Sequence, residues 1–226
     1  MKKLLIVGFC LLVKVCTAQD AAALVQKVKA KIDLVNNYEA AGSMKTNVTF
    51  LKVPEAQVKI YFKKPNLLKI KNEKGISFVP KGAVSINLNN IVSGNQYTAI
   101  DAGYDNVGAI KARVVKLLPT DDNADVVLST LYIDETNLVI VKAKTTTRAN
   151  GSYQLDMLFG KYIAYGLPDK ITFTFNTKDY KLPKGVTFDF DDGTNNKPAE
   201  KNKTGKAEIT FNTYSINKGV ADTFFK

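Results

Sequence analysis

The sequence predicts a mainly β fold of the α+β class, in which one N-terminal helix accompanies a large, curled antiparallel sheet. Three patterns lead to this prediction. Apolar residues recur at the helical period in one clear stretch, from Asp20 to about Asn36. Nearly everything after Tyr38 alternates apolar and polar residues in short runs, as strands do. Gly, Pro, Asn and Asp separate these runs, and a sheet of about ten or more strands curls.

The first eighteen residues have the pattern of a secretory signal peptide. Two lysines precede the apolar stretch Leu4–Val13, and Cys16-Thr17-Ala18 forms a small-residue cleavage site. The apolar stretch is too short to span a bilayer, and Lys14 interrupts it, which argues against a membrane anchor. We therefore expect cleavage after Ala18 and a mature single domain, residues 19–226. The lysine-led leader suggests a bacterial protein of the periplasm.

The helical stretch follows directly. Leu24, Val28, Ile32 and Val35 lie on one face of a helix, and Asp20 suits the N-cap. We expect this helix to cover one side of the sheet.

The strand-like runs place apolar side chains on one face and polar side chains on the other. Lysines alternate with the apolar residues in the two runs around Pro65, and threonines do so later in the chain. Two further runs, Asp125–Ile133 and Leu138–Ala143, are apolar on both faces, which predicts strands that are covered on both sides. The apolar face of the alternating runs consists of Val58, Ile60, Phe62, Leu68, Ile70, Ile171, Phe173, Phe175, Phe188, Phe190 and Phe211.

Turn residues predict how neighbouring strands connect. Asn150-Gly151 is typical of a tight hairpin, here between Leu138–Arg148 and Ser152–Leu158. The segment 134–137 should link the two doubly apolar strands. The stretch from about 191 to 206, rich in Asp, Asn, Lys and Gly, predicts a mobile loop. Residues 85–106 are ambiguous and could hold a short helix near Leu88–Val92.

The composition of the mature chain favours binding over catalysis. Both cysteines lie in the leader, and the chain has no histidine or tryptophan. The exported protein would therefore lack thiols, imidazoles and disulfides, which removes most nucleophiles, general bases and transition-metal ligands. We expect no catalytic residues, no cofactor and no metal site. The spacing of Asp121, Asn123 and Asp125 suggests calcium, but a valine replaces the required loop glycine, so a solvated turn is favoured.

The net charge of +11 falls to +8 once Lys2, Lys3 and Lys14 are cleaved off. The remaining lysines are dispersed, and Arg113 and Arg148 are the only arginines. Nucleic-acid readers depend on arginine, so we expect no nucleic-acid partner. A solvated surface explains the charge best, and contact with an acidic partner or anionic lipid is the alternative.

Several short motifs occur in an order that resembles one known superfamily. The amphipathic segment Ala21–Ile32 precedes Lys59–Ile70, in which a strand ends in Phe-x-x-Pro and leads into the next strand. Val115–Pro119 and Leu131–Asp134 follow, and then come the Asn-Gly turn and the segment 182–190. This progression, over roughly residues 20–192, resembles the LolA/LolB-like periplasmic lipoprotein carriers.

The resemblance implies an unclosed β-barrel whose concave apolar face, under a short helical lid, holds acyl chains. It also implies lipidic or acylated cargo, inner- and outer-membrane lipoprotein-sorting proteins as partners, and a monomer that does not span the membrane. We therefore expect a non-enzymatic periplasmic carrier whose groove is lined by the eleven apolar residues named above. Phe173→Asp should then abolish uptake of a lipid probe and leave the far-UV circular dichroism largely intact.

Two other functions remain open from the sequence. A protein-interaction or stress-sensing module of the cell envelope could use the same fold. An exported carboxylate-dependent hydrolase is the less favoured alternative, because no tryptophan is present to stack on sugar rings.

Overall fold

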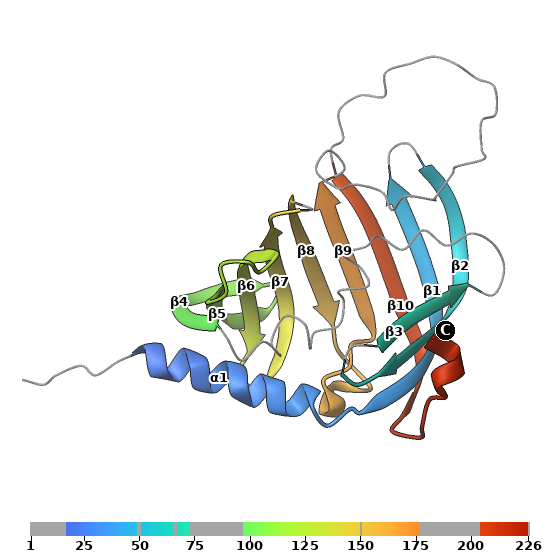
Figure 1. Cartoon of the computed structure of the whole chain (residues 1–226), viewed down its shortest axis with the longest axis horizontal. Coiled ribbons are helices and arrows are strands. Elements are labelled where there is room, and N and C mark those ends of the chain that lie inside the picture. Colours follow the sequence, from blue (N-terminus) through green and yellow to red (C-terminus); the bar gives the residue numbers. More distant parts are fainter. Residues whose placement is uncertain are drawn as a thin grey trace, which may run out of the picture.

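The computed structural model describes residues 17–48, 51–65, 67–72, 97–149, 151–176 and 204–225. In these ranges one sheet of ten antiparallel strands curls into an unclosed barrel, with one α-helix along its rim (Figure 1). The elements are α1 (Thr17–Ile32), β1 (Asn37–Val48), β2 (Leu51–Lys63), β3 (Leu67–Asn72), β4 (Tyr97–Val107), β5 (Ile110–Pro119), β6 (Val126–Asp134), β7 (Val139–Thr147), β8 (Gly151–Leu158), η1 (Ile163–Tyr165), β9 (Lys170–Asn176), β10 (Thr204–Ile216) and η2 (Asp222–Phe225). The predicted fold class is confirmed.

The strand order is β3-β2-β1-β10-β9-β8-β7-β6-β5-β4. The chain thus builds two meanders, β1–β3 and β4–β9, and the final strand, β10, joins them by pairing with β1 on one side and β9 on the other. In the described ranges β3 and β4 are the two free edges of the sheet, so the barrel does not close.

Helix α1 packs against the concave face of the sheet, chiefly on β4. Leu24, Val25 and Val28 are 7 % exposed or less and belong to the main apolar cluster. The helix ends at Ile32, four residues before the predicted end, because Leu34 and Val35 donate to carbonyl oxygens three residues back and Val35 turns into the core. No helix in the described ranges is long and apolar enough to cross a bilayer.

Two apolar clusters lie on opposite faces of the sheet. The main cluster fills the concave face, and a smaller one, Ala112, Val114, Tyr132, Val139 and Val141, lies on the other face of β5, β6 and β7. An irregularity in the β6–β7 pairing at Val141 reverses the alternation there, so that Val139 and Val141 face outward and Ile140 inward. The prediction that β6 and β7 are covered on both faces is thereby confirmed.

The predicted connections are found at β6–β7 and β7–β8. Asp134 closes the first by accepting hydrogen bonds from the backbone of Thr136 and the side chain of Asn137, at 2.9 and 2.7 Å. Two expectations need correction. Residues 204–206 belong to β10 and not to a loop, because they pair with β9 as far as Asn176. Residues 97–106 form β4; the helix expected near Leu88–Val92, and residues 191–203, lie outside the described residues.

The C-terminal segment folds back onto the convex face. The ring of Phe224 in η2 stacks on Tyr61 of β2, with centroids 4.4 Å apart and planes 9° apart. Lys71 of β3 lies over both rings, and Asp222 pairs with Lys63 at 2.6 Å. This contact fixes the chain end beside the free edge β3.

Candidate functional site

The concave face of the sheet carries most of the predicted groove lining. The residues of β2, β9 and β10 in that set are 8 % exposed or less: Val58, Ile60, Phe62, Ile171, Phe173, Phe175 and Phe211. All of them except Phe62 belong to one apolar cluster, and Phe62 stacks on Tyr38, which packs against that cluster. Leu68 and Ile70 of the edge strand β3 are partly buried against the same cluster. Phe188 and Phe190 lie outside the described residues. The strand parity inferred from the sequence therefore places all nine described residues on one face.

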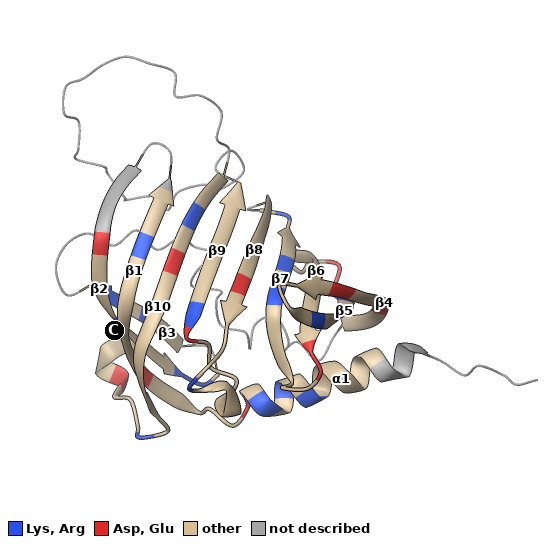
Figure 2. Cartoon of the chain, turned by 180° about the vertical axis from the view of Figure 1, so that it is seen from behind, with Lys and Arg blue, Asp and Glu red and all other residues tan. Residues whose placement is uncertain are grey.

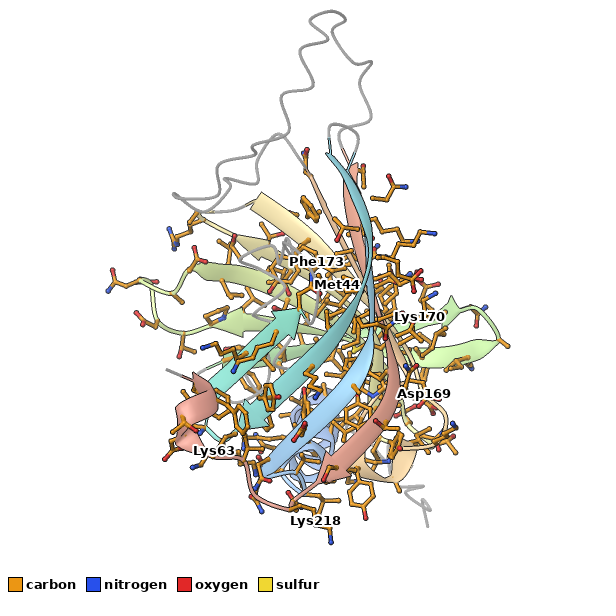
Figure 3. The ribbon with its side chains drawn as sticks, turned by 90° about the vertical axis from the view of Figure 1, so that its right-hand side faces the viewer. Met44, Lys63, Asp169, Lys170, Phe173 and Lys218 are labelled. Atoms are coloured by element: carbon orange, nitrogen blue, oxygen red, sulfur yellow. The ribbon has the colours of Figure 1, made fainter. Side chains whose placement is uncertain are left out.

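The burial of these residues limits how a ligand could reach them. Phe173 is only 1 % exposed, and its ring lies 5.4 Å from that of Tyr153 and 5.3 Å from that of Phe175 (Figure 3). An apolar ligand could reach this surface only if the groups that cover it moved aside.

The neighbouring strands β1 and β10 carry several small residues on the concave face. The concave face carries Ala40 and Gly42 on β1, and Gly205 and Ala207 on β10. The ring of Phe175 lies directly over Gly205, where a Cβ would collide with it. The absence of a side chain at Gly205 thus leaves the space that the ring of Phe175 fills.

Aromatic side chains gather at the end of the concave face where β1 begins and β10 ends. Tyr38 stacks on Phe62 at 5.2 Å and meets Tyr214 edge-on at 5.3 Å, and Tyr162 contacts Tyr214 from the β8–β9 connection. The Tyr214 hydroxyl donates to the Pro168 carbonyl at 2.8 Å. Burial raises the pKa of Tyr38 and of Tyr214 above the ordinary value, so both phenols are neutral at physiological pH.

Polar contacts hold α1 against this face. Lys31 donates to the Asn137 carbonyl at 2.5 Å, and Gln26 donates to the Tyr97 hydroxyl at 3.3 Å. At the end of the helix Asp33 pairs with Lys29 at 2.7 Å and with Lys64 at 3.2 Å. Burial alone would raise the pKa of Asp33, but the two lysines outweigh it and lower the value.

Hydroxyl groups are the other polar feature of the concave face. Ser129 and Thr145 bond each other at 3.0 Å, and Thr147 donates to the Gly151 carbonyl at 3.0 Å. Thr46 of β1 is 6 % exposed, and its Oγ1 has no hydrogen-bond partner. A lone threonine in a strand carries no signal of this kind in the sequence, and sequence reasoning missed it.

One ion pair lies on the edge hairpin β4–β5. Arg113 donates to both carboxylate oxygens of Asp101, at 2.9 and 2.7 Å, and to the Tyr104 hydroxyl at 2.6 Å. The Gly103 N–H and this guanidinium hold the pKa of Asp101 below its usual range. The bidentate geometry stabilises the irregular part of β4, where the register shifts between Asp101 and Tyr104.

Outside the smaller apolar cluster on β5–β7, the sheet carries many charged residues. Acidic and basic residues occur side by side on the strands from β1 across β10, β9 and β8 to β7 (Figure 2), and Lys170 pairs with Glu208 at 2.8 Å. A hollow of about 420 Å³ at the ends of β7–β10 is lined by Lys144, Thr145, Thr146, Ser152, Tyr153, Gln154, Thr174, Phe175, Asn176 and Thr204. Its lining combines hydroxyl, amide and lysine side chains with the rings of Tyr153 and Phe175. Lys45, on β1, is exposed.

The acidic segment with calcium-like spacing serves as a turn. Asp121 Oδ1 accepts the Asn123 N–H at 2.9 Å, and Asp125 Oδ1 accepts the Ala149 N–H at 3.1 Å. Arg148 donates to two carbonyl oxygens of the same turn. Within the described residues, no cluster of three or more His, Cys, Asp or Glu side chains could hold a metal ion.

Solved structures share this architecture. No family model and no curated protein sequence matches the chain. A domain named for outer membrane lipoprotein sorting, from Vibrio parahaemolyticus, superposes with a TM-score of 0.59 at 10 % identity, covering 92 % of this chain and 97 % of that one. A LolA superfamily protein from Nitrosomonas europaea gives 0.58 at 9 % identity, covering 91 % and 97 %.

A DUF1329 family protein from Desulfovibrio piger is similar to the same extent, with a TM-score of 0.56 at 12 % identity over 92 % of this chain and 97 % of that one. At these identities the likeness concerns the fold. The chain has the LolA-like fold that the sequence resemblance implied.

Proposed function

We propose, starting from this LolA-like fold, that the chain is a non-enzymatic carrier that holds acyl chains of a lipidic cargo on its concave face. The observation that carries the proposal is the continuous apolar surface on the inner side of a curled sheet of ten strands. The names of two structural neighbours, one for lipoprotein sorting and one for the LolA superfamily, support it. Cleavage after Ala18 and a single periplasmic domain, residues 19–226, belong to the same proposal, as do a monomeric state and membrane sorting proteins as partners.

The energetics of an acyl chain fit such a site. Burial contributes about 0.8 kcal/mol per CH₂ group, so a sixteen-carbon chain gains at most roughly 12 kcal/mol on leaving water. This gain needs no reactive side chain, which agrees with a mature sequence that lacks histidine and cysteine. Because the lining is closed, part of this favourable free energy is offset by the cost of moving the groups that cover it. Helix α1, which packs on this face through Leu24, Val25 and Val28, is the described element that we propose would move.

The first test is native mass spectrometry of the mature protein purified from a bacterial periplasm, followed by organic extraction. A bound mass that extracts as lipid or as an acylated peptide is the expected result. A clean ligand-free mass, together with no binding of the neutral fluorescent probe N-phenyl-1-naphthylamine, would contradict the carrier and leave the interaction module in its place.

A matched pair of variants tests whether the concave face is the site. Val58 on the concave face is 1 % exposed, and Val141 in the outer cluster is 2 % exposed. Changing either to alanine removes the same atoms and should destabilise the fold by a similar amount, about 1.5 to 3 kcal/mol. Only Val58→Ala should change the affinity for the probe. Equal effects of both variants on binding would argue against the concave face.

A further inference from the structure

Thr46 has an unsatisfied hydroxyl inside an apolar surface. Of the buried side-chain oxygens in the described part of the chain, only Thr46 Oγ1 and Asp169 Oδ1 lack a hydrogen-bond partner. The Asp169 carboxylate still accepts the Lys161 N–H through its other oxygen, at 3.3 Å, whereas the Thr46 hydroxyl has no other polar atom. Buried polar groups in folded proteins are nearly always paired, because an unpaired group keeps its full desolvation penalty.

The register of the sheet shows where this hydroxyl lies. Thr46 pairs with Ala207 on β10, and Ala207 pairs with Phe173 on β9, so the three residues form one cross-strand row on the concave face. Met44 lies two residues earlier on the same face and is labelled with Phe173 in Figure 3. The β10 residues nearest Thr46 on that face, Ala207 and Gly205, are small, but the ring of Phe175 lies over Gly205, so this ring would have to move aside for a ligand to reach the hydroxyl.

The other buried serine and threonine hydroxyls described on the concave face are hydrogen-bonded. Ser129, Thr145 and Thr147 are equally buried, and each has a partner within 3.0 Å. Thr46 is thus the one buried hydroxyl of the described concave face that is free to bind a ligand. A hydroxyl in that position can donate to an acceptor that enters the groove.

We propose that Thr46 is the polar anchor of the groove and donates a hydrogen bond to the carbonyl oxygen that heads an acyl chain, in an ester or an amide. This inference rests on the proposed carrier function and adds the residue that would recognise the carbonyl group of the acyl chain. The carbonyl is the acceptor that such a cargo must bring into an apolar site. From Thr46 to Tyr38, β1 runs eight residues, roughly 27 Å at the rise of a strand, so this face is long enough for an extended acyl chain once the groups that cover it have moved.

The experiment compares two ligands that differ only in the carbonyl: 1-monopalmitoylglycerol, an ester, and 1-O-hexadecylglycerol, the matching ether. Each displaces N-phenyl-1-naphthylamine from the mature protein. We expect the ester to bind about two- to tenfold more tightly than the ether, the range of one net hydrogen bond. Thr46→Val should remove this preference by weakening the ester alone, whereas Thr46→Ser should keep it. Thr145→Val, at a hydroxyl already paired with Ser129, should also keep it.

A second readout needs no ligand. Removing an unpaired buried hydroxyl should raise the melting temperature of the free protein, by about 2 to 4 °C, whereas Thr145→Val should lower it. Equal affinities for ester and ether in the wild type would overturn the anchor and leave the carrier standing, as would a preference that survives Thr46→Val. A fall in melting temperature for Thr46→Val as large as that for Thr145→Val would overturn it too. Failure of both ligands and of the probe to bind would instead overturn the carrier itself.

Discussion

Gly205→Ala would test how tightly the ring of Phe175 packs against β10. A Cβ at this position would lie 2.6 Å from Cε2 and 2.9 Å from Cε1 of the Phe175 ring, and closer still to Cζ. Carbon atoms in contact sit about 3.5 to 4.0 Å apart, so the ring would have to retreat by about 1 Å. Phe175 is 4 % exposed and leans on Phe173, so it has little room to do so.

The expected magnitude follows from two opposing effects. Overpacking of this kind costs about 1 to 3 kcal/mol, and the gain from replacing glycine in a strand offsets about 0.5 to 1 kcal/mol. We therefore expect a net loss of about 1 kcal/mol in the free energy of unfolding. Urea unfolding followed by far-UV circular dichroism suits a chain without tryptophan.

A double-mutant cycle with Phe175→Leu assigns this loss to the ring. The smaller side chain leaves room for the new methyl group, so the double variant should be more stable than the sum of the single effects predicts, by about 1 kcal/mol. Effects that add within about 0.5 kcal/mol would refute the reasoning, as would a stabilising Gly205→Ala.

Three further predictions concern burial and the chain end. Phe173→Asp would bury a carboxylate at a cost of several kcal/mol, so we now expect the loss of native far-UV circular dichroism along with uptake, and an intact spectrum would contradict this. Burial raises the pKa values of Tyr38 and Tyr214 above 10, so the folded state loses stability as the pH rises above 10, by about 1.4 kcal/mol for each of these tyrosines at pH 11. The pKa values of Tyr97 and Tyr153 are raised as well, so Tyr38→Phe should reduce the total loss, measured by urea unfolding, by about 1.4 kcal/mol, and an unchanged loss would contradict the assignment to Tyr38. Phe224→Ala should cost about 1 kcal/mol and speed trimming by carboxypeptidase, whereas equal trimming rates would mean that the ring stack does not hold the chain end.

The alternating strands could be predicted from the sequence, because successive side chains of a strand point to opposite faces of the sheet. Val58–Phe62 and Ile171–Phe175 kept their parity in the structure, since no bulge interrupts either run. The same rule failed for β4. Its register shifts between Asp101 and Tyr104, and its tyrosine and isoleucine side chains are exposed at the sheet edge, so no apolar alternation marks it.

The contacts that define the site could not be predicted, because they join distant parts of the chain. Arg113 and Asp101 meet only through the hairpin register. Thr46 is buried in part because β1 pairs with β10, which lies far along the chain. A threonine on a solvent-exposed strand has the same sequence pattern, so the sequence does not distinguish the two cases. Helix α1 ends early, and Val35 is buried in the core after the helix has ended. From helical periodicity alone, Val35 is predicted to belong to one more helical turn.

The position of β10 has a consequence for folding if the chain is exported as proposed. The last strand pairs with the first, and Asn217 even accepts a hydrogen bond from the Asn37 N–H, 180 residues away. Until β10 arrives, the two meanders have no shared core, and such non-local pairing forms slowly. The topology thus delays completion of the sheet until β10 has been synthesised. An unfolded chain can be threaded through a translocation channel, and the same strand that completes the sheet would complete it on the far side.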